Sequence, residues 1–350
     1  MRIPTAPAQV RDSKPEKYPV RDRPAECARR GCWVAARGYA RLVGMDHHFV
    51  PQFYLDAFCD PATPEGQDPW VWVADLKERT IRRKAPKNVA SRSDYYAIPD
   101  STGEKTHAIE EMFSRIESDA APIVARLLRG EFDLSVKDRA ALGHLMAAMA
   151  TRGPSFRENI ERFLAEVARK VLLVSAQFDP DFLKVQSTKD LSDEEIEKAR
   201  QMILAGDWEV TAKPVASLMP VLESAAIILP ILCQMEWAFF VAYESSSFLT
   251  CDTPLSWVAP TLPPGPYGSG LAMRNVEVTF PIGPRVCFVG TWREGNSGSA
   301  PVDDEIVYQL NRRRVDFAHR TVFADSEAGA QQALEIASAR GDDSARARPE

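Results

Sequence analysis

Residues 45–55 of the chain read MDHHFVPQFYL. This stretch places two of the five histidines beside an aromatic residue, a proline and a glutamine, and an apolar run follows. We expect the folded part of the chain to begin here. Imidazole is the side chain most often used for metal ligation and for proton transfer near neutral pH. The same stretch therefore supplies the first candidate site residues.

Residues 1–44 differ from everything that follows them. They hold ten Lys or Arg against four acids, and five prolines with no apolar period. Such a composition cannot bury enough surface to offset the entropy of ordering the chain. Three interpretations are open: a disordered basic tail, a transit-like segment, or upstream sequence before a true start at Met45. We favour the last.

The whole chain has 350 residues, of which 45% are hydrophobic, and a net charge of -6. This length is enough for one large domain or two smaller ones. We expect a single domain over residues 45–324 and a frayed tail over residues 325–350. A mildly acidic chain has no general affinity for nucleic acid. We expect no membrane span and no membrane partner, since Pro230, Gln234 and Glu236 interrupt the most apolar window, residues 227–241.

The six cysteines are scattered and form no C-x-x-C pair, which argues against a zinc ribbon. The N-terminus has no secretory apolar core. Free thiols in a reducing cytoplasm are the expected state, so we predict a cytoplasmic protein.

Hydrophobic periodicity predicts an α+β fold, in which a central helical layer packs on a mostly antiparallel sheet. Residues 70–83 read as an N-terminal β-hairpin, and residues 94–98 as a further short strand. Five helical patterns follow, over residues 106–129, 137–151, 155–174, 191–205 and 215–232. Ser192 and Glu195 form a capping box at the start of the fourth helix. Later strands are predicted at residues 237–243, 248–251, 276–280, 286–289 and 320–323, with a helix over residues 303–314. A run of helices between runs of strands favours α+β over a doubly wound sheet.

Several polar residues lie where the pattern places apolar ones. His48 and Gln52 are four residues apart and share a face if the segment is helical. Glu117 and Glu110 lie on the flank of an apolar helical stripe, where an unpaired carboxylate would be costly. For each residue a role in chemistry and a local structural role are both open.

Three further candidates lie at the ends of predicted elements. Arg152 prolongs an apolar stripe at a helix end, which suits a clamp for a carboxylate or phosphate, or a structural bridge to Glu117 or Asp252. Asp252 closes a strand and fits metal binding, base chemistry or an ordinary turn. Asn311 precedes three consecutive arginines, of which at least one must point to solvent. The sequence contains no P-loop, G-x-G-x-x-G, G-x-S-x-G or H-E-x-x-H motif.

Six segments, in order along the chain, resemble a bacterial family called domain of unknown function 4238. They are residues 48–58 (HFVPQFYLDAF), 116–117 (IE), 152–157 (RGPSFR), 248–254 (FLTCDTP), 280–284 (FPIGP) and 311–323. The resemblance spans about residues 47–324 and implies no activity. Its polar motif positions coincide with His48, Glu117, Arg152, Asp252 and Asn311. Gly153 and Cys251 depart from the typical Thr and Ser.

Two functions compete on these grounds. The first is a hydrolase or phosphodiesterase, with a nuclease as one form of it, whose catalytic residues are His48, Glu117, Arg152, Asp252 and Asn311. In it His48, Glu117 and Asp252 bind a divalent metal or do acid–base work, and Arg152 holds an anionic ligand. The alternative is a non-catalytic binding or interaction protein, including a defence or toxin-type effector. There the same residues form a buried structural network.

Overall fold

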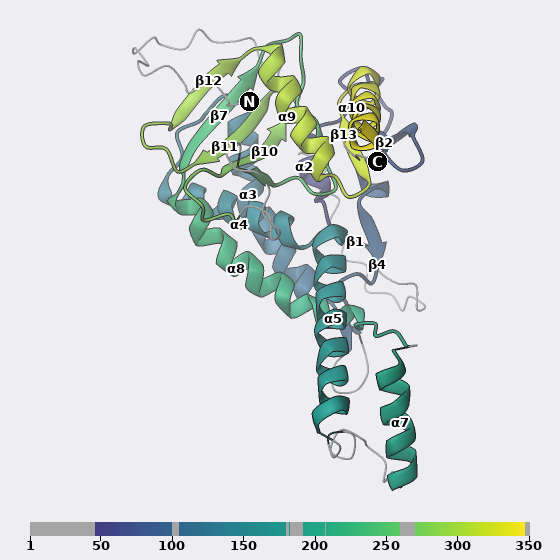
Figure 1. The fold of residues 1–350 in the computed structure, drawn as a ribbon. Helices are drawn as coiled ribbons and strands as arrows, with labels where there is room; N and C mark the ends of the chain where they lie inside the picture. Colours follow the sequence, from purple (N-terminus) through teal and green to yellow (C-terminus); the bar gives the residue numbers. More distant parts are fainter. Residues whose placement is uncertain are drawn as a thin grey trace, which may run out of the picture. The chain divides into compact units, whose positions relative to one another are not determined.

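A computed structural model describes residues 46–99, 105–179, 182, 192–206, 208–259 and 270–346 (Figure 1). The expectations for residues 1–44 lie outside this part of the chain. The described residues divide into two compact units: those up to Pro154 and from Leu222 onward form the first unit, and those within Ser155–Val221 form the second. The single domain expected over residues 45–324 stays a prediction.

A five-stranded sheet forms the centre of the first unit. Its order is β12-β7-β11-β10-β9, and all pairs are antiparallel except β12 with β7. The strands are β7 (Glu236–Ala242), β9 (Ser256–Val258), β10 (Glu277–Gly283), β11 (Val286–Thr291) and β12 (Gly298–Val302). Every residue of β10 and β11 is buried, as expected for strands covered on both faces.

Helices cover both faces of this sheet. On one face Phe239 and Phe288 join a core with residues of α3 (Ala108–Leu128) and α4 (Val136–Thr151). Helix α9 (Asp304–Phe317) lies along the other face (Figure 1). There Phe240 and Val289 join a core with Val307 and Leu310 of α9. The predicted α+β fold, with a helical layer on a mostly antiparallel sheet, is therefore confirmed.

The predicted hairpin belongs to a second, four-stranded antiparallel sheet of order β3-β2-β13-β8. The strands are β2 (Val71–Asp75), β3 (Thr80–Lys84), β8 (Thr250–Cys251) and β13 (Thr321–Ala324). The last strand of the chain thus lies between β2 and β8.

Residues after 324 continue into a helix, α10 (Glu327–Arg346), where the sequence led us to expect a frayed tail. Ala330, Ala333 and Ile336 are buried and pack with Ala74 and Val322 on one face of the four-stranded sheet. The spacing is helical, but two of these three side chains are alanines, which carry a weak apolar signal. The small side chains let the helix approach the sheet closely.

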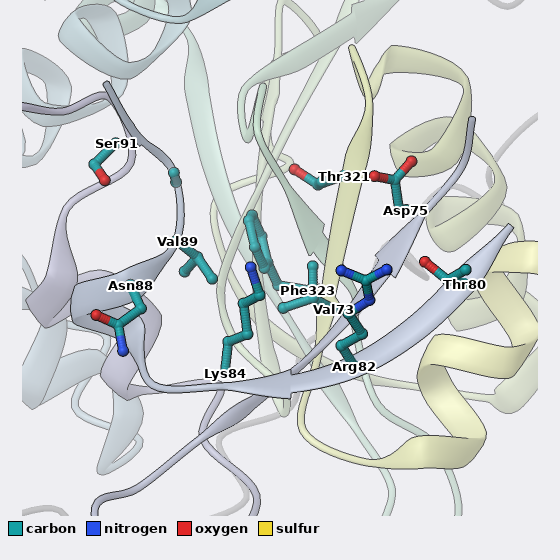
Figure 2. A pocket seen from close by; sticks show the side chains of 11 residues that line it. Val73, Asp75, Thr80, Arg82, Lys84, Asn88, Val89, Ser91, Thr321 and Phe323 are labelled. Carbon is teal, nitrogen blue, oxygen red and sulfur yellow. The ribbon is translucent and has the colours of Figure 1, made fainter. Parts of the chain in front are cut away.

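The other face of the four-stranded sheet borders a cavity of about 200 Å³ (Figure 2). Its far wall is formed by residues 88–91, which begin at the last residue of the short helix η1 (Pro86–Asn88).

Short elements connect the hairpin to the helices. Strand β1 (Asp46–His48) pairs antiparallel with β4 (Ser91–Ser93), and β5 (Ile98–Pro99) pairs with β6 (Lys105–Thr106). The strand predicted over residues 94–98 is instead mostly a turn, in which Asp94 has a positive φ of 54°. Helix α2 (Gln52–Asp56) begins after Pro51, which has an extended backbone.

The second unit contains most of α5 (Pro154–Phe178) together with α7 (Asp193–Ala205) and η2 (Pro214–Ser217). The capping box of α7 is confirmed: Ser192 Oγ accepts from Glu195 N, and the Glu195 carboxylate accepts from Ser192 N at 2.8 Å. Helix α8 (Leu218–Gln234) crosses the boundary between the units.

Among the described residues, one helical stretch, Pro214–Gln234, is long and apolar enough to cross a membrane by length and composition. Length and composition alone do not place this helix in a membrane, so the expected absence of a membrane span stays a prediction. Core helices of soluble proteins meet the same criterion, although here 22% of the window is buried.

Candidate functional site

Three of the five predicted site residues meet in the first unit around Arg152, at the end of α4. Arg152 Nε donates to the carbonyl oxygen of Phe49 at 2.9 Å, and Nη1 donates to Glu117 Oε1 at 2.7 Å. Its guanidinium carbon lies 5.1 Å from the centre of the Phe113 ring. Arg152 is 1% exposed, so its charge is held almost wholly inside the protein. The arginine therefore ties the first residues of the fold to α3.

The chain bends at Arg152 and Gly153, between the end of α4 and the start of α5. Arg152 is the C-cap of α4, and Pro154 begins α5 two residues later. A side chain at Gly153 would meet the carbonyl oxygen of Asp252 at 3.2 Å. Because glycine has no Cβ, it lets this turn approach the backbone after β8 closely. The typical Thr at this position would have to displace that neighbour.

His48 and Gln52 form the outer part of the same group. His48 Nε2 lies 3.2 Å from Gln52 Nε2 and 3.3 Å from the carbonyl oxygen of Lys87. When His48 Nε2 carries no hydrogen, it accepts a hydrogen bond from the Gln52 side-chain amide. When it carries one, it donates to the Lys87 carbonyl oxygen. Burial lowers the pKa of His48, and the contact with Lys87 opposes that effect. Glu117 and Arg152 also act on this imidazole electrostatically, so it belongs to their environment.

Glu110 completes the group, which we call the Arg152 cluster: His48, Gln52, Glu110, Glu117 and Arg152. Burial raises the pKa of Glu110 to about 7, Arg152 opposes the rise, and Glu117 adds to it. Two buried atoms of the cluster have no hydrogen-bond partner among the described residues, Glu110 Oε2 and Arg152 Nη2. Buried polar atoms are almost always paired, so two such atoms in one cluster need an explanation.

His47, the other histidine of the opening stretch, has a structural role. It is fully buried, and its Nδ1 accepts from Tyr96 N at 2.8 Å. Its Nε2 lies 3.1 Å from His107 Nδ1, and its ring stacks on Tyr96 with centroids 5.6 Å apart. Both ring nitrogens are therefore used inside the protein.

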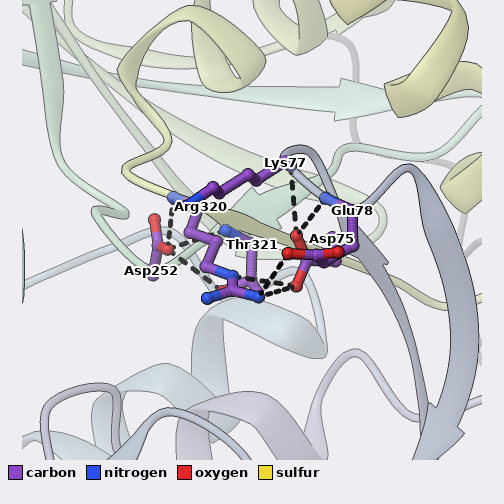
Figure 3. A network of polar contacts seen from close by, with 6 residues as sticks. All are labelled: Asp75, Lys77, Glu78, Asp252, Arg320 and Thr321. Carbon is purple, nitrogen blue, oxygen red and sulfur yellow. Dashed lines mark hydrogen bonds and ion pairs between the residues drawn. The ribbon is translucent and has the colours of Figure 1, made fainter.

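The carboxylate of Asp252 points toward β13 (Figure 3). Oδ1 accepts from His319 N at 2.8 Å, and Oδ2 accepts from Arg320 N at 2.8 Å and Thr321 N at 2.7 Å. Thr321 Oγ1 donates to Oδ2 as well, at 3.1 Å. Burial raises the pKa of Asp252, and these hydrogen bonds oppose that rise. Asp252 thus holds the start of β13.

The predicted metal set of His48, Glu117 and Asp252 is not assembled by this geometry. In the part of the chain that the structure describes, no three His, Cys, Asp or Glu side chains are placed to hold a metal ion. The physical reason is that both oxygens of Asp252 already accept from backbone N–H groups, while Glu117 is committed to Arg152.

Asn311 lies on α9 and forms hydrogen bonds with the segment that precedes β8. Its Oδ1 accepts from Leu249 N at 2.8 Å, and its Nδ2 donates to Ser247 O and Gln332 Oε1, each at 3.0 Å. The amide is buried and satisfied, so Asn311 joins α9 to the segment that precedes β8 and to α10, and it is not part of the Arg152 cluster. Of the three arginines that follow it, Arg312 is exposed, as predicted.

Sequence reasoning missed Arg314, the third of those arginines. It is 2% exposed and donates to the carbonyl oxygens of Pro254 and Thr279. Arg314 is three residues after Asn311, so both lie on the buried face of α9. That spacing was the available signal for an inward arginine.

A known family covers most of this chain. Its match spans residues 46–328, from β1 to the first turn of α10, and includes every residue of the Arg152 cluster. The chain belongs to the DUF4238 family. That family is described as protein of unknown function. No curated protein and no solved structure matches this DUF4238 chain. The motif positions His48, Glu117 and Arg152, far apart in sequence, therefore converge on one cluster, whereas Asp252 and Asn311 fasten the framework of the same DUF4238 domain.

Proposed function

We propose that the DUF4238 chain is a hydrolase whose reaction takes place at the Arg152 cluster. The observation that supports this most is Arg152 Nη2, a donor on a side chain that is 1% exposed and that has no acceptor among the described residues. Leaving such a donor unpaired costs about 1–3 kcal/mol, more when the group is charged. A carboxylate or phosphoryl oxygen of a substrate would satisfy it.

The neighbouring groups suit proton transfer to and from such a substrate. A carboxyl group with a pKa of about 7, as for Glu110, is present in both protonation states near neutral pH. His48, whose pKa is lowered, is mostly neutral there and can accept a proton from water. In the proposed reaction His48 takes a proton from the attacking water, Glu110 gives one to the leaving group, and Arg152 stabilises the negative charge on the oxygen.

A substrate can enter the Arg152 cluster only if the side chains at its outer edge move. Arg152 Nη2 is buried in the structure, whereas Gln52 is exposed and contacts His48. Rotation of the Gln52 side chain would free the imidazole and open the cluster from outside. Once a substrate has entered, the same side chains would close over it. Hydrogen bonds in a catalytic site are often long before the substrate binds and shorten when it is bound.

A second candidate function is a non-catalytic binding protein in which the cluster is structural. The observation favouring it is the pair of short hydrogen bonds by which Arg152 joins Phe49 to Glu117. A buried ion pair of this kind fixes one arrangement of the chain without any chemistry.

The experiment that separates the two is a hydrolase assay with a matched pair of variants. p-Nitrophenyl acetate, p-nitrophenyl phosphate and bis-p-nitrophenyl phosphate serve as substrates. The Glu110→Gln variant should lose about 10²–10⁴-fold in rate if Glu110 is the general acid. Glu111→Gln, on the exposed neighbouring position of α3, should keep the wild-type rate. Equal rates for both variants, or no turnover of any substrate by the wild-type protein, would favour the binding protein.

A further inference from the structure

The cavity on the four-stranded sheet has a basic wall built by one strand. Side chains alternate along a strand, so Thr80, Arg82 and Lys84 of β3 face the cavity. Arg83 points to the other side, where its guanidinium carbon lies 5.1 Å from the Trp70 ring centre. Figure 2 shows Arg82 and Lys84 reaching over Val73 and Phe323. Two positive charges therefore converge above an apolar floor.

Both cations are available to a ligand. The side chains of Arg82 and Lys84 form no hydrogen bond or ion pair with the part of the chain that the structure describes, and both residues are exposed. The Cα atoms of alternate strand residues are roughly 7 Å apart, so both side chains can reach one bound group. The opposite wall adds neutral hydrogen-bonding side chains, Asn88 and Ser91.

The one acid that lines the cavity does not cancel these charges. Asp75 Oδ2 accepts from Arg320 Nε at 2.9 Å and lies 2.8 Å from Arg320 Nη2 (Figure 3). Burial alone would raise the pKa of Asp75, but hydrogen bonds from Arg320 and from the backbone N–H groups of Glu78 and Lys77 lower it. Its negative charge is therefore matched by Arg320. The cavity keeps an excess of positive charge in a chain whose net charge is -6.

We propose that this cavity is a second binding site, which takes a small phosphate monoester with a compact apolar body. The dianionic phosphate would lie between Arg82 and Lys84, since a guanidinium and an ammonium are the two usual partners of phosphate oxygens. The apolar body would lie against Val73 and Val89, each 8% exposed, above the fully buried Phe323. A volume of about 200 Å³ is small for a ligand pocket and fits one ring rather than a dinucleotide. No residue lining the cavity belongs to the Arg152 cluster, so the site stands apart from the proposed hydrolase activity.

The test is isothermal titration of the full chain with phenyl phosphate, inorganic phosphate and benzoate. We expect saturable binding of phenyl phosphate that weakens as sodium chloride is raised, because salt screens charges at an exposed site. Inorganic phosphate lacks the apolar body and benzoate carries one negative charge, so each should bind about tenfold more weakly. Arg82→Ala and Lys84→Ala should each weaken phenyl phosphate at least tenfold. Both positions are exposed on an edge strand, and a thermal melt verifies that the variants fold.

Two control variants show whether binding takes place in this cavity. Lys77→Ala removes the same charge from the β2–β3 turn, outside the cavity lining, and should leave binding unchanged. Glu110→Gln removes the turnover of phenyl phosphate that the proposed hydrolase would catalyse, and it should leave binding in this cavity unchanged, so a failed hydrolase proposal does not affect this one. Absence of phenyl phosphate binding, equal binding of benzoate or inorganic phosphate, or full binding by the Arg82→Ala/Lys84→Ala double variant would overturn the inference.

Discussion

Replacing Glu110 by glutamine should change how stability depends on pH. Burial raises the pKa of Glu110 from its ordinary value of 4.5 to about 7. The unfolded chain therefore ionises this carboxyl at lower pH than the folded protein does. Protonated Glu110 contributes stability that is fully present below the unfolded pKa and is lost as the pH rises toward 7. Glutamine has the same shape, stays neutral and removes this dependence.

The size of the effect follows from the same pKa. A pKa difference of this kind corresponds to roughly 2.5 kcal/mol of unfolding free energy lost between pH 5 and pH 8. Because Glu110 is only partly buried, solvent screening reduces the expected value to about 1–2 kcal/mol. The wild-type protein should lose this amount relative to Glu110→Gln over that pH range.

Guanidinium denaturation at pH 5, 6, 7 and 8, followed by tryptophan fluorescence, measures the effect. At each pH the unfolding free energy of the wild type is subtracted from that of the variant. The contributions of all other titrating groups cancel in this difference. Glu111→Gln, exposed on the same helix, is the matched control and should give a flat difference. A flat difference for Glu110→Gln as well would refute the role assigned to burial in the Arg152 cluster.

Three substitutions in the framework have outcomes set by the local contacts of the replaced residue. Asp252→Ala should lower the free energy of unfolding by about 3 kcal/mol, because three backbone N–H groups lose their acceptor. Amide hydrogen exchange of residues 319–321 should become faster, and exchange at the wild-type rate would contradict this. Asn311→Ala should cost about 2 kcal/mol in a denaturant titration, since Leu249 N is left buried and unpaired, and a loss below about 0.5 kcal/mol would argue against that role. Gly283→Ala should lower the free energy of unfolding by about 1–3 kcal/mol, because the added Cβ would lie 2.5 Å from Leu128 Cδ2. An unchanged melting temperature would show that the neighbouring core side chains move to accommodate it.

Periodicity predicted the long elements well, because a helix or strand with one strongly apolar face leaves a regular signal. Helices α3 and α4 and the hairpin β2–β3 follow the expected ranges closely. Helix α10 escaped because its buried face is largely alanine, and β1 because it has only three residues. Pairing partners of such short strands are distant in sequence and leave no local pattern.

The candidate site was predictable only where two side chains meet. The bridge from Arg152 to Glu117 was one of the alternatives that the sequence offered, since both residues lie inward on helices. Asp252 could not be assigned, because its partners are backbone N–H groups, which every residue except proline carries. The cavity was missed for another reason: Arg82, Arg83 and Lys84 are three consecutive basic residues on β3, and such a run gives no local sign of a cavity.

The position of β13 has a consequence for how the protein is made. The four-stranded sheet cannot be completed until residues 321–324 leave the ribosome, because β13 pairs with both β2 and β8. Until then the nascent hairpin exposes the unpaired backbone groups of β2, which are a template for contacts with other chains. Bringing β2 and β13 together closes a loop of more than two hundred residues, and contacts of that separation form late. Premature termination anywhere before β13 therefore yields a polypeptide with an open β edge and an incomplete cavity.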